Sequence, residues 1–147
     1  MEFDSTQPIW HQLVGEFSRR IGAGEWQPGA RIPAVRELAA ELQVNPNTVQ
    51  RAFGELERDG LVRAERTAGR FVTDDASLIR TLRRQLVAEA ADAFAGRAAG
   101  VGLTLADAQT LLAERWDDDA AHHPDTDTDI RTDRGAAQAG LRDRARG

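Results

Sequence analysis

The stretch that decides the fold is residues 44–56, which read VNPNTVQRAFGEL. Asn45 and Pro46 are typical of the cap and the first turn of an α-helix. The apolar residues that follow recur at helical spacing, so one face of this helix is expected to be buried. They are Val49, Ala52, Phe53 and Leu56. Gly60 predicts the end of the helix.

Two further helices are predicted upstream. The first begins at Pro8, shows apolar residues about every fourth position and ends at Gly22. Its apolar residues are Ile9, Leu13, Phe17 and Ile21. The second follows Pro33 and carries its apolar residues at i, i+3, i+4 and i+7. These are Val35, Leu38, Ala39 and Leu42. A short turn joins it to the helix after Asn45, and two helices joined in this way form a helix-turn-helix.

From Leu61 to Thr73 the helical period gives way to two short β-like runs, residues 61–63 and 70–73. The turn between them contains Ala68 and Gly69. This pattern predicts a β-hairpin directly after the helix-turn-helix, which is the arrangement of a wing.

Residues 77–99 carry apolar side chains at helical spacing with no evident cover within the chain, so we expect them to pack against a second subunit. Gly100 and Gly102 break this helix, and Thr104 with Asp107 resembles a capping box before a last helix. The residues predicted to mediate dimerisation are Ile79, Leu82, Leu86, Phe94, Leu105, Leu111 and Leu112.

The predicted fold is therefore mainly α with a small β-hairpin. A winged helix-turn-helix domain spans residues 1–75, and a short two-helix dimerisation region spans 76–116. Residues 117–147 hold eight aspartates, five arginines and almost no large apolar side chains. Such a composition predicts a disordered acidic tail.

The polar face of the helix after Asn45 is the most informative feature for function. Asn47, Gln50, Arg51 and Gly54 share the side opposite the apolar stripe. Asn and Gln can pair with adenine in the major groove, Arg can pair bidentately with guanine, and Thr48 can hold a phosphate. An ordinary solvated helix face is the alternative for any one of them. Their grouping between a helix-turn-helix and a hairpin favours DNA.

Three arginines outside that helix are further candidates for DNA contact. Arg36 lies in the first turn of the preceding helix, where it can reach a phosphate or a guanine. A surface pairing with Glu37 or Glu41 is its alternative. Arg66 and Arg70 flank the predicted wing tip, where arginine suits the negative potential of the minor groove and Gly69 permits a close backbone approach.

The stretches 31–39 (RIPAVRELA) and 44–53 (VNPNTVQRAF), followed by Gly-Leu-Val at 60–62, resemble the GntR family of transcriptional regulators over residues 7–73. The resemblance implies a two-fold dimer on a palindromic operator. The implied DNA contacts come from Arg36, Asn47, Thr48, Gln50, Arg51 and Gly69. The short C-terminal helical pair is similar to the YtrA-like branch, whose members often repress a neighbouring transporter operon and their own gene.

Two departures from the family pattern stand out. Ala34 occupies a position where the family usually has a serine helix cap, and the lost cap costs about 1 kcal/mol. Thr67 stands where the wing often has a first glycine, which weakens the case for base contact by the wing tip.

The overall charge argues against a nucleic-acid partner. The chain has a net charge of −5, and residues 1–75 alone carry nine arginines against twelve acidic residues, a net of −3. Affinity for DNA must therefore come from arginines focused on one face. All 19 basic residues are arginine.

The sequence gives little support for catalysis, metal binding or membrane insertion. The chain has no cysteine, which removes disulfides and thiolate sites. His11 has no evident nucleophilic partner, and His122 with His123 lies in the acidic tail. The aspartates at 125, 127 and 129 imitate a calcium loop, but Ile130 and Ala136 occupy the positions that need Gly and Glu. We expect no enzyme, no cofactor and no metal.

The sequence shows neither a signal peptide nor a membrane span, so we expect a cytoplasmic protein with no membrane partner.

Two alternatives stay open. The winged-helix fold also serves as a protein-interaction module without sequence-specific DNA binding, because fold does not fix function. A small-molecule effector is compatible with a pocket lined by Leu86, Phe94 and Leu112, although a plain dimer core explains the same residues. Nothing in the sequence assigns the identity of an effector.

Overall fold

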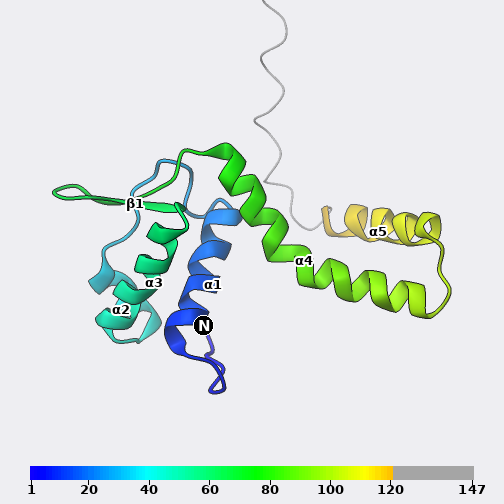
Figure 1. The fold of residues 1–147 in the computed structure, drawn as a ribbon, viewed down its shortest axis with the longest axis horizontal. Coiled ribbons are helices and arrows are strands. Elements are labelled where there is room, and N and C mark those ends of the chain that lie inside the picture. Colours follow the sequence, from blue (N-terminus) through cyan, green and yellow to red (C-terminus); the bar gives the residue numbers. More distant parts are fainter. Residues whose placement is uncertain (121–147) are drawn as a thin grey trace, which may run out of the picture. The chain divides into compact units, whose positions relative to one another are not determined.

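The computed structural model of this chain describes residues 1–120 (Figure 1). Its elements are α1 (Ile9–Gly22), α2 (Val35–Leu42), α3 (Pro46–Arg58), β1 (Val62–Glu65), β2 (Gly69–Val72), α4 (Ala76–Gly100) and α5 (Leu105–Ala120). The mainly helical fold with a single antiparallel hairpin in the described residues confirms the predicted fold class. The chain divides into two compact units, Met1–Phe94 and a second that begins at Ala95.

The core of the first unit forms where α3 packs on α1. The four residues of the predicted α3 stripe are all 0% exposed. Phe53 of α3 stacks on Phe17 of α1 with ring centroids 5.0 Å apart and an interplanar angle of 15°. The ring centroid of Trp26 lies 5.2 Å from that of Phe17, so the three rings form one aromatic cluster. Aromatic packing of this kind contributes more than the buried area alone, so it holds α3 in a defined rotation against α1.

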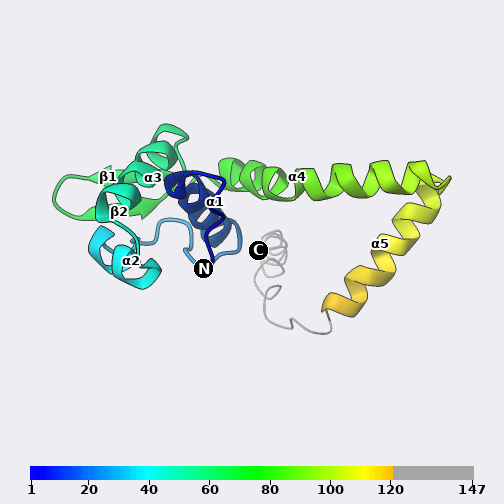
Figure 2. The same ribbon diagram turned by 90° about the horizontal axis from the view of Figure 1, so that it is seen from below.

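The hairpin is attached to the core at its base. Val62 pairs with Val72 in the antiparallel register, and both side chains are buried. The segment before α2 adds a short third edge, because Ile32 N–H donates to the Arg70 carbonyl at 2.9 Å and Val72 N–H donates to the Ala30 carbonyl at 2.9 Å. Figure 2 shows α1, α2 and α3 gathered beside this hairpin. The wing is therefore positioned relative to the helix-turn-helix by main-chain hydrogen bonds.

The beginning of α4 belongs to the same core, which corrects part of the predicted dimerisation surface. Ile79 and Leu82 are 3% and 6% exposed and lie in the core cluster with α1 and α3. Arg83 Nε donates to the Gly22 carbonyl at 2.8 Å, and Leu86 lies against Gly22, whose lack of a side chain permits the approach. Ile79 and Leu82 are covered by their own chain and are not available to a partner.

The remaining residues of that predicted surface are more accessible. Leu86, Leu105 and Leu112 are exposed, whereas Phe94 and Leu111 are half-buried. The first three have exposed fractions of 42%, 75% and 47%.

The predicted capping interaction before α5 is confirmed. Thr104 Oγ1 accepts a hydrogen bond from the Asp107 N–H at 3.2 Å and donates one to the Asp107 carboxylate at 2.8 Å. The helix then continues through Ala120, past the boundary predicted after Trp116. Most of the predicted acidic tail, with His122, His123 and the aspartates from 125 to 129, lies outside the described residues.

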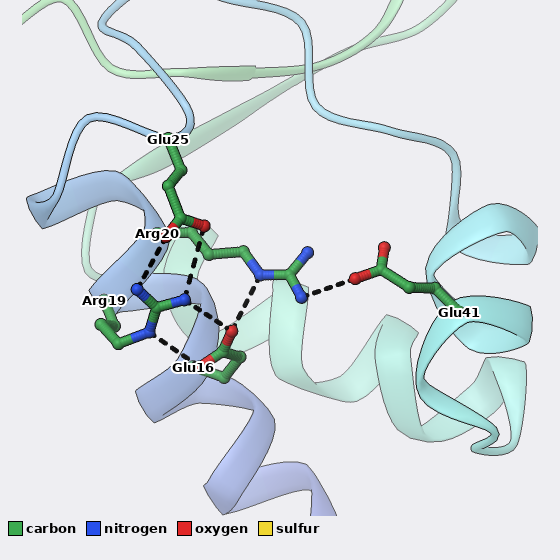
Figure 3. Close-up of polar contacts among 5 residues, drawn as sticks. All are labelled: Glu16, Arg19, Arg20, Glu25 and Glu41. Carbon is green, nitrogen blue, oxygen red and sulfur yellow. Dashed lines mark hydrogen bonds and ion pairs between the residues drawn. The ribbon is translucent and has the colours of Figure 1, made fainter. Parts of the chain in front are cut away.

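A charged network ties α1 to α2 and to the loop after α1 (Figure 3). Glu16 accepts hydrogen bonds from Arg19 at 2.9 Å and from Arg20 at 2.9 Å. Arg19 also pairs with Glu25 at 2.8 Å, and Arg20 reaches across to Glu41 of α2 at 2.7 Å. The hydrogen bond from Arg19 is the main reason that the pKa of Glu16 falls from its ordinary 4.5 to about 2.

This lowered pKa predicts a specific acid sensitivity. Because the Glu16 pKa is lower in the folded chain than in the unfolded chain, its stabilising effect is present above pH 4.5 and is lost as the pH falls towards 2. We expect Glu16→Gln to lower the melting temperature at neutral pH and to flatten its decline between about pH 5 and pH 2. Thermal unfolding followed by circular dichroism measures this. An unchanged profile in Glu16→Gln would refute the role of this carboxylate.

Candidate nucleic-acid interface

The polar face of α3 is presented to solvent along its length. Asn47, Gln50, Arg51 and Gly54 are all exposed, while Thr48 beside them is half-buried. The predicted cap is confirmed, because Asn45 Oδ1 accepts a hydrogen bond from the Asn47 N–H at 2.8 Å. The cap fixes the first turn of α3, where a recognition helix meets base edges. Apart from the adjoining residues and backbone of α3 itself, no atom lies within 4 Å of the place that a Cβ on Gly54 would take, so this face is open there.

Arg51 is held in place by an aromatic side chain that the sequence analysis did not connect with it. Its guanidinium carbon lies 4.3 Å from the centroid of the Trp10 ring on α1. His11 contacts the edge of the same ring at 5.7 Å between centroids. A cation–π contact orients the guanidinium without using its N–H donors, which leaves them available to a guanine or a phosphate.

Arg36 lies exposed in the first turn of α2. The two carboxylates considered as its surface partners contact other groups, because Glu37 accepts from the Ala34 N–H at 3.3 Å and Glu41 pairs with Arg20. Within residues 1–120 no hydrogen bond or ion pair involves the Arg36 side chain. It therefore presents its full charge to solvent.

Two of the three predicted wing residues, Arg66 and Gly69, lie in or next to the turn of the hairpin. Arg66 is exposed in the turn of the hairpin. Gly69 has a φ of +103°, and Arg31 Nε lies 3.1 Å from the place that a Cβ would take, so both conformation and space favour glycine there. Arg31 was not among the predicted site residues, and it adds an exposed arginine beside the wing.

Arg70 is placed differently from the prediction. It lies within β2, opposite Ala64, and its side chain turns back onto α3 instead of reaching out at the wing tip. Its Nε donates to Glu57 at 2.8 Å, and its Nη2 donates to Gln50 at 2.7 Å. The physical reason is the stronger local attraction of the Glu57 carboxylate, since a charge-assisted hydrogen bond is about twice as strong as a neutral one.

The acidic residues near this surface are mostly engaged with arginines. Glu41 pairs with Arg20, Glu57 with Arg70, and Glu55 with Arg58 at 3.0 Å. The local potential is then set by the remaining exposed arginines, which are Arg31, Arg36, Arg51 and Arg66. A positive face can in this way coexist with a net charge of −3 for residues 1–75.

The site residues missed by sequence reasoning are Trp10, Arg31 and Glu57. Each acts through a contact between distant parts of the chain, as in the pairs Trp10 with Arg51 and Glu57 with Arg70. Spacing along one helix carries no signal for such contacts. The one clue available was the seven-residue spacing of Gln50 and Glu57, which places both on one side of α3.

The N-terminus of α2 offers a test of the missing cap. Ala34 is the cap residue and has no side-chain acceptor, while the backward hydrogen bond from its N–H to Glu37 is present. We expect Ala34→Ser to complete the capping box and to raise the free energy of unfolding by about 1 kcal/mol. Urea denaturation measures this. The matched control is Ala40→Ser in the exposed middle of the same helix, which should lower stability slightly. Equal effects of the two substitutions would contradict the capping assignment.

A family model described as "Bacterial regulatory proteins, gntR family" matches residues 11–72. The chain is 36% identical over 103 residues to the HTH-type transcriptional regulator YhcF of Bacillus subtilis, which covers 70% of this chain and 85% of the relative. It is 33% identical over 95 residues to the HTH-type transcriptional repressor YtrA of the same organism, which covers 58% of this chain and 73% of YtrA.

Solved structures give a similar result. A GntR family transcriptional regulator from Listeria monocytogenes aligns with a TM-score of 0.66 and 29% identity, covering 76% of this chain and 98% of that structure. A transcriptional regulator from Oenococcus oeni aligns with a TM-score of 0.63 and 25% identity, covering 79% of this chain and 97% of the other. These alignments extend beyond the winged helix-turn-helix.

Residues 1–120 contain neither a metal-binding cluster nor a membrane-spanning helix. Among residues 1–120 no cluster of His, Asp and Glu is arranged to hold a metal ion. None of the helices described is both long enough and apolar enough to cross a membrane.

Proposed function

The chain belongs to the GntR family of bacterial regulatory proteins, and from this premise we propose that it is a repressor that binds an inverted-repeat operator as a homodimer. Transcriptional regulators of this family are DNA-binding proteins without enzymatic activity.

The observation that carries the proposal is the division of α3 into two faces. The apolar stripe is completely buried, and the opposite side presents Asn47, Gln50 and Arg51 to solvent. This helix is the second of the helix-turn-helix, the position from which side chains enter the major groove. Arg36 and Arg66 lie exposed before and after it in the chain, where phosphate contacts position a recognition helix.

Dimerisation is supported by an apolar face on α5. Leu105, Leu112 and Trp116 recur at helical spacing and are 75%, 47% and 76% exposed. Val101 and Leu103, in the turn before α5, are 72% and 37% exposed. Apolar side chains gathered in this way are typical of an interaction surface. A second copy is the simplest partner, because most soluble oligomers are symmetric dimers.

Repression is supported by the similarity to YtrA, which is a transcriptional repressor. The resemblance of the short C-terminal helical pair to the YtrA-like branch implies, as the genes regulated, a neighbouring transporter operon and the regulator's own gene. A dimer with two-fold symmetry reads two half-sites related by the same symmetry, so the operator should be an inverted repeat.

The DNA-reading residues are tested by substitution. We expect Arg36→Ala and Arg51→Ala each to weaken binding to the DNA upstream of this gene by about tenfold or more, because each removes a charge or a base contact. Fluorescence anisotropy with a labelled duplex measures the dissociation constants. Arg58→Ala is the matched control on the same helix, since Arg58 pairs with Glu55 near the C-terminal end of α3. Wild-type affinity in both Arg36→Ala and Arg51→Ala would favour the protein-interaction alternative.

The dimer is tested by placing a charge on the α5 face. We expect Leu112→Asp to convert the protein from dimer to monomer in sedimentation velocity and to weaken operator binding, because a carboxylate cannot be buried there without a partner. Ile9→Asp is the matched control, since Ile9 is an apolar residue of α1 that is 44% exposed against 47% for Leu112. A Leu112→Asp variant that remains dimeric would exclude this face from the interface.

A further inference from the structure

Arg70 of β2 contacts both α3 and the buried core beneath it. Its guanidinium carbon lies 5.0 Å from the centroid of the Phe53 ring, which is completely buried. Its Nε donates to Glu57 at 2.8 Å, and the two side chains are only 26% and 33% exposed. A guanidinium supported by a ring on one face and by a carboxylate at one edge has few alternative positions.

The same guanidinium then reaches Gln50 on the polar face of α3. Arg70 Nη2 donates to Gln50 Oε1 at 2.7 Å, a short and charge-assisted contact. Only the carbonyl oxygen of a glutamine amide can accept from arginine, so the contact also fixes which end of the amide is which. The Nε2 group, with two N–H donors, is the end directed away from Arg70.

We infer that Arg70 is a positioning residue that makes Gln50 present its hydrogen-bond donors, in preference to its acceptor, to the major groove. The inference rests on the proposed function, because it assigns the base preference of the same DNA-reading face. A glutamine that pairs bidentately with adenine uses Oε1 to accept from the adenine amino group and Nε2 to donate to N7. Here Arg70 takes one of the two lone pairs of Oε1 and places a cation beside it, so Oε1 is a poorer acceptor for the adenine amino group.

The base that fits this arrangement carries a carbonyl acceptor in the major groove. Guanine offers N7 and O6, and thymine offers O4, to the two donors of Nε2. Adenine presents its amino donor beside N7, and cytosine presents only a donor. The geometry therefore selects guanine or thymine at the operator position that Gln50 contacts, although glutamine free of such a contact favours adenine.

Selection of binding sites from a random duplex library tests this inference. The wild-type protein, Gln50→Ala, Arg70→Ala and Arg70→Lys are compared, and Gln50→Ala identifies the position that Gln50 reads. At that position we expect guanine or thymine in the wild type, and an increase in adenine of about tenfold in both Arg70 variants. Lysine keeps the charge but lacks the planar fork that contacts Glu57 and Gln50 together, so it should behave like alanine.

Arg66→Ala is the matched control, because it removes an arginine from the same hairpin without touching α3. It should weaken binding uniformly and leave every base preference unchanged. Adenine preferred by the wild type at the Gln50 position, or an unchanged preference in both Arg70 variants, would overturn the inference while leaving DNA recognition intact. A wild-type protein that selects no sequence at all would instead overturn the proposed function.

A second measurement needs no DNA and detects the contact itself. In ¹⁵N-resolved NMR spectra of the free full-length protein, Arg70→Lys and Glu57→Gln should shift the side-chain amide signal of Gln50, because both disturb the guanidinium that holds it. Arg66→Ala should leave that signal in place. Circular dichroism confirms that each variant is folded. A Gln50 signal insensitive to both substitutions would show that Arg70 does not position this amide.

Discussion

The face that we propose reads DNA depends on how α3 is packed against α1. Phe53 stacks on Phe17, and the apolar stripe of α3 is completely buried. Interiors packed at this density permit little rotation of a helix about its axis. Once one face of α3 is fixed inward, Asn47, Gln50 and Arg51 have to lie on the opposite side. The proposed recognition surface is thus a consequence of the core.

The same aromatic cluster extends its influence to the wing. Phe53 supports Arg70, and Arg70 connects β2 with Glu57 and Gln50 of α3. On the other side of the helix-turn-helix, Trp10 of α1 supports Arg51. Two arginines near the DNA face therefore rest on aromatic rings. This pre-organisation lowers the conformational entropy lost on binding, and so favours affinity in a domain with a net charge of −3.

Local pattern was sufficient to predict the helices, the hairpin and the polar face of α3, because each depends on periodicity, caps or turn residues within a short stretch. The cap at Asn45 and the capping interaction before α5 were confirmed for this reason. Periodicity shows that a face is buried but does not name its partner. Ile79 and Leu82 were therefore assigned to a second subunit, although their own core covers them.

The placement of Arg70 illustrates the same limit in the site. A hairpin pattern places it near the wing tip, whereas the register opposite Ala64 and the attraction of Glu57 direct it onto α3. No spacing rule links a strand residue to a helix residue thirteen positions earlier. Contacts of this kind depend on tertiary packing, and they determine which donors and acceptors the surface offers.

We propose that a few arginines exposed on one face bind the DNA. The most direct test is the salt dependence of the association constant for a duplex that the protein selects from a random library. If each subunit neutralises two phosphates through Arg36 and Arg66, a dimer displaces counterions from four. The logarithm of the association constant should then fall linearly with the logarithm of salt concentration, with a slope of about −3.6. A slope near zero would contradict docking of this face on the DNA backbone.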